Sequence, residues 1–132
     1  NCLTIHGKSR FPGLSVWLRD GRKTSVAVPD GCLLVQAAKQ LEHLTGGHIL
    51  AGFHEVAVGT ATVAAIEAAE AAGANLWRVS STCFGHVASD QELRPLGRFA
   101  TPEALSRYPP IKAGDMVAEE LRAISLGSQG QR

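Results

Sequence analysis

Short strand-like runs separated by turn residues fill the first half of the sequence and restrict the fold to a small set. Asp20-Gly21 lies between two alternating runs, residues 14–18 and 24–28, and this dipeptide is typical of a tight hairpin. Pro29-Asp30-Gly31 predicts a second turn. The continuously apolar run over residues 32–36 follows, and we expect it to be buried on both faces. Short strands with Gly and Pro turns favour a β-sandwich or barrel.

Helical patterns interrupt and end this series of strands. Residues 60–72 are rich in alanine and Gly73 follows them, so we predict an inserted helix that ends at this glycine. Residues 76–84 then predict another strand. Asp115 is a predicted cap for a C-terminal helix, and residues 127–132 are predicted to form a disordered, frayed tail.

Composition and charge exclude several classes of protein. The 132 residues are 45% hydrophobic and 19% charged, which is typical of one globular domain. The net charge of +1 gives no indication of nucleic-acid binding. No apolar run is long enough to cross a bilayer, and no secretory signal opens the chain. We therefore expect a cytoplasmic protein without a membrane partner, in which Cys2, Cys32 and Cys83 are reduced and buried.

Taken singly, no residue of the sequence defines a chemical site. His54 lies in a strand-like run, where a histidine is more often structural than a ligand. Arg78 and Ser80 lie two residues apart on the strand predicted over residues 76–84, so they should share one face. An arginine fork with a neighbouring hydroxyl can bind a carboxylate. Arg-x-Ser is nevertheless a common pattern, and a solvated strand also explains it.

The remaining histidines show no spacing that is typical of metal ligands. They are His6, His43, His48 and His86. We interpret each of them as structural or exposed. The sequence also lacks Gly-x-Ser-x-Gly, so an α/β-hydrolase site has no support.

A series of short motifs runs in order along nearly the whole chain. The motifs are Leu3-Thr4-Ile5, Pro12-Gly13-Leu14-Ser15-Val16, residues 28–36 (VPDGCLLVQ), residues 41–47 (LEHLTGG), Phe53-His54-Glu55-Val56, Arg78-Val79-Ser80 and residues 108–115 (YPPIKAGD). Each motif is short, but their order is specific. Together they resemble the C-terminal portion of the isopenicillin N synthase-like family of 2-oxoglutarate/iron(II)-dependent dioxygenases.

The resemblance implies a mainly β fold, a partial double-stranded β-helix or jelly roll over residues 1–126, with an inserted helix and C-terminal helices. It implies that two histidines and one carboxylate bind iron(II). His54 would be the last of these ligands, and Arg78 and Ser80 would bind the far carboxylate of 2-oxoglutarate. The implied reaction couples oxidative decarboxylation of 2-oxoglutarate to oxidation of a small-molecule substrate that the sequence does not identify. No further catalytic residue is assigned.

Three features depart from the family pattern. The His-x-Asp pair that supplies the other iron ligands is absent, and the match places it a few residues before Asn1. We therefore expect a fragment that is inactive alone and associates with the missing N-terminal region or with another copy. The predicted helix within residues 59–75 lengthens the interval between His54 and Arg78. Glu55 stands where the family usually has arginine.

Two alternatives stay open. The chain could be a non-catalytic jelly-roll binding module, in which case the longer protein would lack His-x-Asp. It could also be a cupin-like metalloprotein that uses several of its histidines, which requires at least three near one point. The histidines considered for this are His43, His48, His54 and His86.

Overall fold

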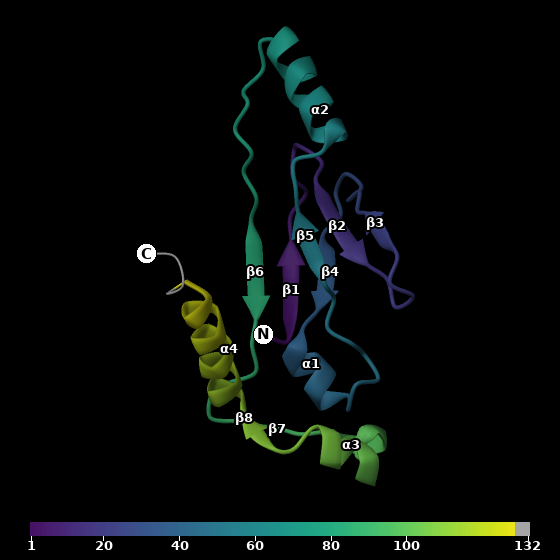
Figure 1. Cartoon of the computed structure of the whole chain (residues 1–132), viewed down its shortest axis with the longest axis vertical. Helices are drawn as coiled ribbons and strands as arrows, with labels where there is room; N and C mark the ends of the chain where they lie inside the picture. The colour runs from purple at the N-terminus through teal and green to yellow at the C-terminus, as the bar shows by residue number, and fades with distance from the viewer. Residues whose placement is uncertain (129–132) are drawn as a thin grey trace. The chain divides into compact units, whose positions relative to one another are not determined.

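The computed structural model describes residues 1–128 (Figure 1). The chain divides into two compact units. Unit 1 comprises residues 1–4, residues 37–51 and the chain from Phe84 onward. Unit 2 comprises residues 5–36 and 52–83. Among the described residues, no helix combines the length and the apolar character that crossing a bilayer requires.

Unit 2 is built around an antiparallel sheet with strand order β3-β2-β5. In this sheet β2 (Leu14–Trp17) is central and pairs with β3 (Lys23–Ser25) and β5 (His54–Val56). The β2–β3 connection turns at Gly21, whose φ of 82° lies in the left-handed region that favours glycine. The hairpin predicted from Asp20-Gly21 is therefore confirmed.

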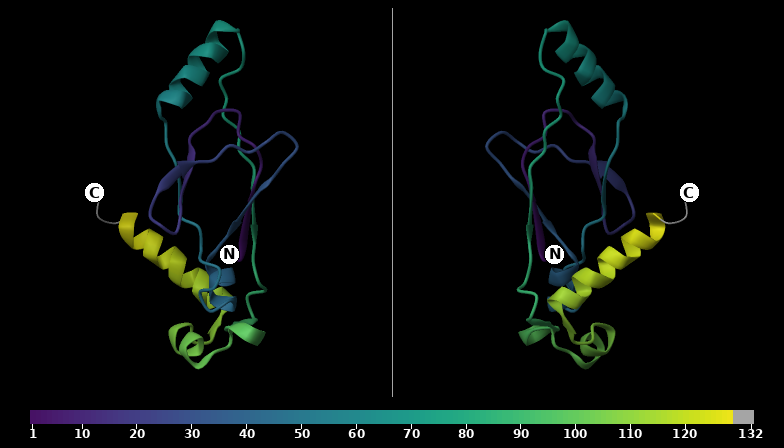
Figure 2. Two further views of the ribbon diagram at one scale, coloured as in Figure 1. Left: turned by 90° about the vertical axis from the view of Figure 1, so that its right-hand side faces the viewer. Right: turned by 90° about the vertical axis from the view of Figure 1, so that its left-hand side faces the viewer.

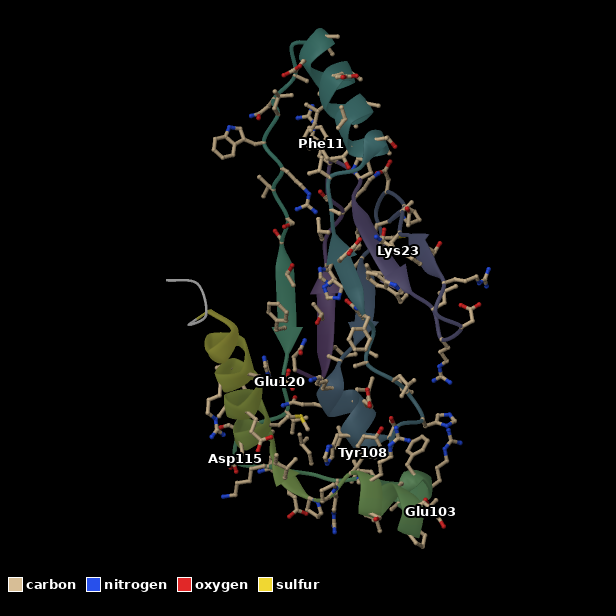
Figure 3. The ribbon with its side chains drawn as sticks, viewed as in Figure 1. Phe11, Lys23, Glu103, Tyr108, Asp115 and Glu120 are labelled. Carbon is tan, nitrogen blue, oxygen red and sulfur yellow. The ribbon has the colours of Figure 1, made fainter. Side chains whose placement is uncertain are left out.

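Helix α2 (Thr60–Ala71) follows β5 and confirms the predicted inserted helix. The hydroxyl of Thr62 accepts a hydrogen bond from the Gly59 N–H at 3.2 Å and donates to the Pro12 carbonyl at 3.1 Å. These bonds tie the first turn of the helix to the loop before β2. The helix otherwise extends away from β2, β3 and β5, as both views of Figure 2 show, with Phe11 buried near its first turn (Figure 3).

The strand predicted over residues 76–84 is wrong for most of its length. Residues 74–81 form no regular secondary structure, and β6 runs only over Thr82–Gly85. Trp77 and Val79 are 78% and 71% exposed. A strand is stabilised by a ladder of hydrogen bonds and by cross-strand packing. Before Thr82, this segment accepts a backbone hydrogen bond at Ser81, whose carbonyl lies 3.0 Å from the Gly7 nitrogen.

The predicted burial of residues 32–36 on both faces is also wrong. β1 (Leu3–His6), β4 (Leu34–Ala37) and β6 form a sheet in the order β4-β1-β6. Leu33 and Val35 are nevertheless 65% and 57% exposed. An apolar strand is buried on both faces only where both faces are covered by other elements. Within residues 1–128, one face of this apolar run is uncovered.

The predicted burial of the cysteines is only partly correct. Cys2 is half-buried, whereas Cys32 and Cys83 are exposed. All three thiols are free. Apolar neighbours in the sequence do not guarantee burial: Cys32 belongs to the uncovered run, and Cys83 lies in β6, where Thr82 and Phe84 are also exposed.

Unit 1 contains the shortest strands and most of the helices. Its elements after residue 37 are α1 (Lys39–Leu44), β7 (Glu92–Leu93), the 3-10 helix η1 (Gly97–Phe99), α3 (Pro102–Arg107), β8 (Ile111–Lys112) and α4 (Ala113–Ser128). β7 pairs with β8, and Leu93 in β7 is completely buried. The buried amide of Gln40 accepts from the Val87 N–H at 3.0 Å and donates to the Ala113 carbonyl at 3.5 Å. The core of unit 1 therefore satisfies its central polar side chain.

The C-terminal helix begins earlier and ends later than the sequence predicts. α4 starts at Ala113, so Asp115 lies within the first turn instead of capping it. A carboxylate there still interacts favourably with the helix dipole. Residues 127 and 128, predicted as part of the tail, are helical, and residues 129–132 lie outside the described residues.

The burial of Leu93 leads to a prediction about stability. Replacing Leu93 with Ala should lower the free energy of unfolding by about 2.5–5 kcal/mol, because it removes buried methyl groups and leaves a cavity. Leu121, which is 59% exposed on α4, is the matched control, and Leu121→Ala should change stability by less than about 0.5 kcal/mol. Urea denaturation followed by circular dichroism measures both. Equal effects of the two substitutions would contradict the assignment of Leu93 to the core.

Candidate functional site

His54 is the first residue of β5 and pairs with Val16 of β2. Its side chain is exposed, and its Nδ1 lies 3.0 Å from Nε2 of Gln36. The same Gln36 amide donates to the Gly52 carbonyl at 2.8 Å. Because an amide nitrogen is a donor, Nδ1 of His54 is the acceptor in this arrangement. Gln36 therefore orients the ring and leaves Nε2 of His54 for another partner.

A second imidazole, that of His6, lies next to His54. The two ring centroids are 5.9 Å apart, and the ring planes meet at 70° in an edge-to-face arrangement. His6 ends β1 and His54 begins β5, so the two rings come from strands of different sheets. We interpreted His6 as structural or exposed because its sequence surroundings show no ligand spacing. Only the tertiary structure brings it to His54.

The polar atoms of His6 are poorly satisfied. Its Nε2 is buried and has no hydrogen-bond partner among the described residues. Its Nδ1 lies 3.4 Å from the hydroxyl oxygen of Thr82, which is long for a hydrogen bond. A buried polar group without a partner costs about 1–3 kcal/mol. This nitrogen would therefore gain from a bound ion or ligand.

Arg78 and Ser80 lie in the irregular segment before β6, and both are exposed. Strand periodicity does not place the two side chains on one face, because the backbone there is not a strand. Within residues 1–128, no hydrogen bond or ion pair involves the guanidinium of Arg78. Among the described residues, no hydrogen bond joins Arg78 or Ser80 to His54. Their role as a carboxylate clamp stays a prediction.

The other histidines have structural surroundings or lie apart. His43 is buried in unit 1, where its Nε2 lies 2.9 Å from the Pro109 carbonyl. His48 packs against the ring of Phe99, with centroids 5.2 Å apart. His86 is exposed. In the part of the chain that the structure describes, no three His, Cys, Asp or Glu side chains converge on a metal position. The cupin-like alternative therefore loses its basis.

Two of the sequence motifs meet in unit 1 and have a structural role. The Tyr108 hydroxyl donates to Oε1 of Glu42 at 3.0 Å, and Oε2 of Glu42 accepts from the Ala51 N–H at 2.8 Å. Burial, together with the hydrogen bond to Glu42, raises the pKa of Tyr108. Gly47 has a φ of 81°, and a Cβ there would lie 2.5 Å from the Tyr108 hydroxyl oxygen. Contacts between residues 41–47 and 108–115 therefore fix the conformation of the loop at Gly47.

The residues around His54 match an iron ion in chemical type. Imidazole nitrogen is a normal ligand of Fe(II), and the chain presents two imidazoles here, one with a buried nitrogen that has no partner. Within residues 1–128 the guanidinium of Arg78 has no hydrogen-bond or ion-pair partner, and a guanidinium is in chemical type a good partner for a carboxylate.

Several solved structures resemble this chain over nearly its whole length. A 2OG-Fe(II) oxygenase family protein from Caulobacter crescentus aligns with a TM-score of 0.70 and 30% identity, over 94% of this chain and 38% of that chain. A full-length Neurospora crassa protein in complex with alpha-KG aligns with a TM-score of 0.74 and 16% identity, over 94% and 35% of the two chains. Its complex with alpha-KG and thymine aligns equally well. No protein-family model and no curated protein matches the sequence.

These likenesses confirm the expected fold class. The chain has the partial jelly-roll fold of 2OG-Fe(II) oxygenases, mainly β with few helices. The neighbours support the broad 2OG oxygenase family, while the isopenicillin N synthase-like subfamily stays a prediction. The chain spans 35% to 38% of the length of the neighbours described above.

Proposed function

We propose that this chain is the C-terminal part of an iron(II)- and 2-oxoglutarate-dependent oxygenase of the isopenicillin N synthase-like group that oxidises a small molecule. The observation that carries the proposal is the 30% identity to the Caulobacter crescentus protein across 94% of this chain. The ordered motifs around His54 and Arg78 point the same way. The complexes of the Neurospora crassa protein with alpha-KG are consistent with this cosubstrate.

In this proposal His54 binds iron(II) through Nε2. Nδ1 would then carry the proton, so the Gln36 side chain, whose Nε2 lies 3.0 Å from Nδ1, would have to present its amide oxygen to the ring. The His-x-Asp pair of the family would come from the part of the longer protein outside this chain. Bound iron supplies the oxidising chemistry, and the protein binds and orients the reactants.

Arg78 and Ser80 bind the far carboxylate of 2-oxoglutarate in the same proposal. A guanidinium can donate two parallel hydrogen bonds to a carboxylate, and the serine hydroxyl adds a third. Both side chains are exposed, and that of Arg78 has no partner within residues 1–128. They are therefore free to bind an anion.

The test uses the longer protein under anaerobic conditions. Addition of Fe(II) and 2-oxoglutarate should produce the weak visible charge-transfer band of this complex, and later exposure to oxygen with substrate should release succinate. The absence of both signals would contradict the proposal and favour a non-catalytic jelly-roll module. The 132-residue chain alone is expected to show no turnover, and a normal rate from it would show that the ligands are misassigned.

Unit 2 exposes many large apolar side chains, which leads to a prediction about association. They are Trp17, Leu18, Leu33, Val35, Phe53, Val56, Val58, Val63, Leu76, Trp77 and Val79. Exposed apolar surface of this kind is typical of an interface. We predict that the isolated chain self-associates and that the missing region of the longer protein covers these residues instead.

Light scattering coupled to gel filtration measures this association. Phe53, 75% exposed, lies beside β5, and Phe53→Glu should shift the isolated chain toward the monomer. Thr24→Glu is the matched control, because Thr24 is also exposed, on β3, and gains the same charge without losing an apolar group. A monomeric wild-type chain, or equal effects of both substitutions, would refute the prediction.

A further inference from the structure

The Gln36 side chain contacts both the Gly52 carbonyl and the imidazole of His54, and all three residues belong to unit 2. We propose that Gln36 is a positioning residue that fixes the proton of His54 on Nε2, and that iron binding at His54 requires the Gln36 amide to turn over. The first part rests on the contacts of Gln36 alone. The second part rests on the proposed function and deepens it by naming the group that opposes the ligand form of His54.

The orientation of the Gln36 amide follows from its two partners. Its Nε2 lies 2.8 Å from the Gly52 carbonyl oxygen and 3.0 Å from Nδ1 of His54. A carbonyl oxygen can only accept a hydrogen bond, so the atom that faces it must be the amide nitrogen and not the amide oxygen. The NH2 group has two hydrogens, and one is available for each of the two acceptors.

This orientation sets the tautomer of His54. Nδ1 accepts from the Gln36 amide, so in the neutral ring the proton lies on Nε2. A protonated Nε2 is a hydrogen-bond donor and has no lone pair for a metal ion. The contacts in the structure therefore hold His54 in the tautomer that cannot bind iron through Nε2.

Iron binding through Nε2 requires the opposite arrangement. The proton must then lie on Nδ1, and the Gln36 amide must turn so that its oxygen accepts from it. The same turn breaks the bond to Gly52 and puts the amide oxygen where the nitrogen now lies, 2.8 Å from another acceptor oxygen. The Gly52 carbonyl therefore opposes the ligand form of His54.

Gly52 lets the Gln36 amide reach this position. A Cβ at residue 52 would lie 2.7 Å from Nε2 of Gln36 and 3.1 Å from its Cγ, which is closer than the usual separation of nonbonded atoms. A larger residue at position 52 therefore displaces the amide from His54. Gly52 is exposed and lies before β5, so water can bind its carbonyl once the amide has turned.

Nitrogen NMR of the histidine side chains in the metal-free 132-residue chain measures the tautomer directly, because protonated and unprotonated ring nitrogens have well-separated chemical shifts. At a pH where the rings are neutral, His54 should lie more completely in the Nε2–H form than His86, whose exposed ring is the internal reference. The same tautomer ratio in both histidines would overturn the proposal, and so would a protonated Nδ1 in His54.

Two substitutions should change the tautomer in different ways. Gln36→Glu presents only acceptor oxygens, so the ratio should shift toward Nδ1–H by at least about tenfold, as for other hydrogen bonds to a charged group. Gly52→Ala displaces the amide, so the ratio of His54 should approach that of His86. Gln91→Glu, at an exposed glutamine of unit 1, adds the same charge and should leave the tautomer unchanged.

The tautomer distinguishes positioning from simple packing. If Gln36 only packs against His54, its replacement changes the stability of the fold but not the position of the proton. Circular dichroism checks that Gln36→Glu and Gly52→Ala keep the fold. An unchanged tautomer in either folded variant would overturn the proposal.

The iron affinity of the longer protein separates this inference from the proposed function. Gln36→Glu should bind Fe(II) about two- to twelvefold more tightly than the wild type under anaerobic conditions, because the ligand form of His54 no longer competes with the hydrogen bond to Gly52. An unchanged affinity with a shifted tautomer would overturn the second part of the proposal. Failure of Fe(II) to bind either protein would contradict the proposed function and the second part with it, whereas the tautomer measurements test the positioning role of Gln36 by themselves.

Discussion

The His54→Ala variant of the longer protein should lose iron(II) binding by at least about 100-fold and should lose turnover with it. The substitution removes an imidazole from the predicted ligand set, and a methyl group cannot replace it. Iron content after anaerobic loading and succinate release measure the two effects separately. His54 is exposed at the start of β5, so the fold should tolerate the change.

His86→Ala is the control for this prediction. His86 is also exposed, but it lies in unit 1 and has no proposed role in metal binding. Its replacement should leave iron content and turnover unchanged. If His54→Ala retained full iron content and activity, the placement of the distal ligand in Phe53-His54-Glu55-Val56 would be wrong.

Replacing Arg78 with Ala in the longer protein should weaken 2-oxoglutarate binding by about 100- to 4,000-fold. Removing one partner of a hydrogen-bonded charge pair costs about 3–5 kcal/mol where the pair is desolvated, and each 1.4 kcal/mol is about tenfold in affinity. Anaerobic titration of the iron-loaded protein with 2-oxoglutarate measures the dissociation constant. Iron content should stay normal, because Arg78 is not a proposed ligand.

Graded variants sharpen this second prediction. Arg78→Lys keeps the charge but loses the planar fork, so its affinity should lie between those of the wild type and Arg78→Ala. Ser80→Ala removes one hydrogen bond to the charged carboxylate and should weaken binding about tenfold. Arg94→Ala, at an exposed arginine of unit 1, should have no effect. An unchanged dissociation constant in Arg78→Ala would exclude Arg78 from the cosubstrate site.

Features of the fold that depend on local backbone chemistry were predicted correctly from the sequence. Asp20-Gly21 predicted the β2–β3 hairpin, because few residues other than glycine adopt the φ of 82° found at Gly21. The alanine-rich stretch predicted α2, because alanine has the highest helix propensity. The order of the short motifs predicted the jelly roll that the likeness to 2OG-Fe(II) oxygenases confirms.

Features that depend on partners distant in the sequence were predicted less well. The residues before Thr82 look like a strand because they alternate, yet they lack a hydrogen-bonded ladder and stay irregular. Leu33 and Val35 are apolar, yet they are exposed because no described element covers them. A sequence pattern shows which residues of a segment are apolar. Their burial also requires another element of the fold that packs against them.

The candidate site shows the same division. The sequence by itself determined that His54 is a strand residue within an oxygenase-like series of motifs, because strand alternation and motif order are properties of neighbouring residues. Only the tertiary structure decided that the ring centroids of His6 and His54 lie 5.9 Å apart. It also buries Nε2 of His6, which has no hydrogen-bond partner among the described residues. The physical reason is that β1 and β5 belong to different sheets. Packing between two sheets brings together residues that are far apart in the sequence, and no regular spacing along the chain predicts such a contact.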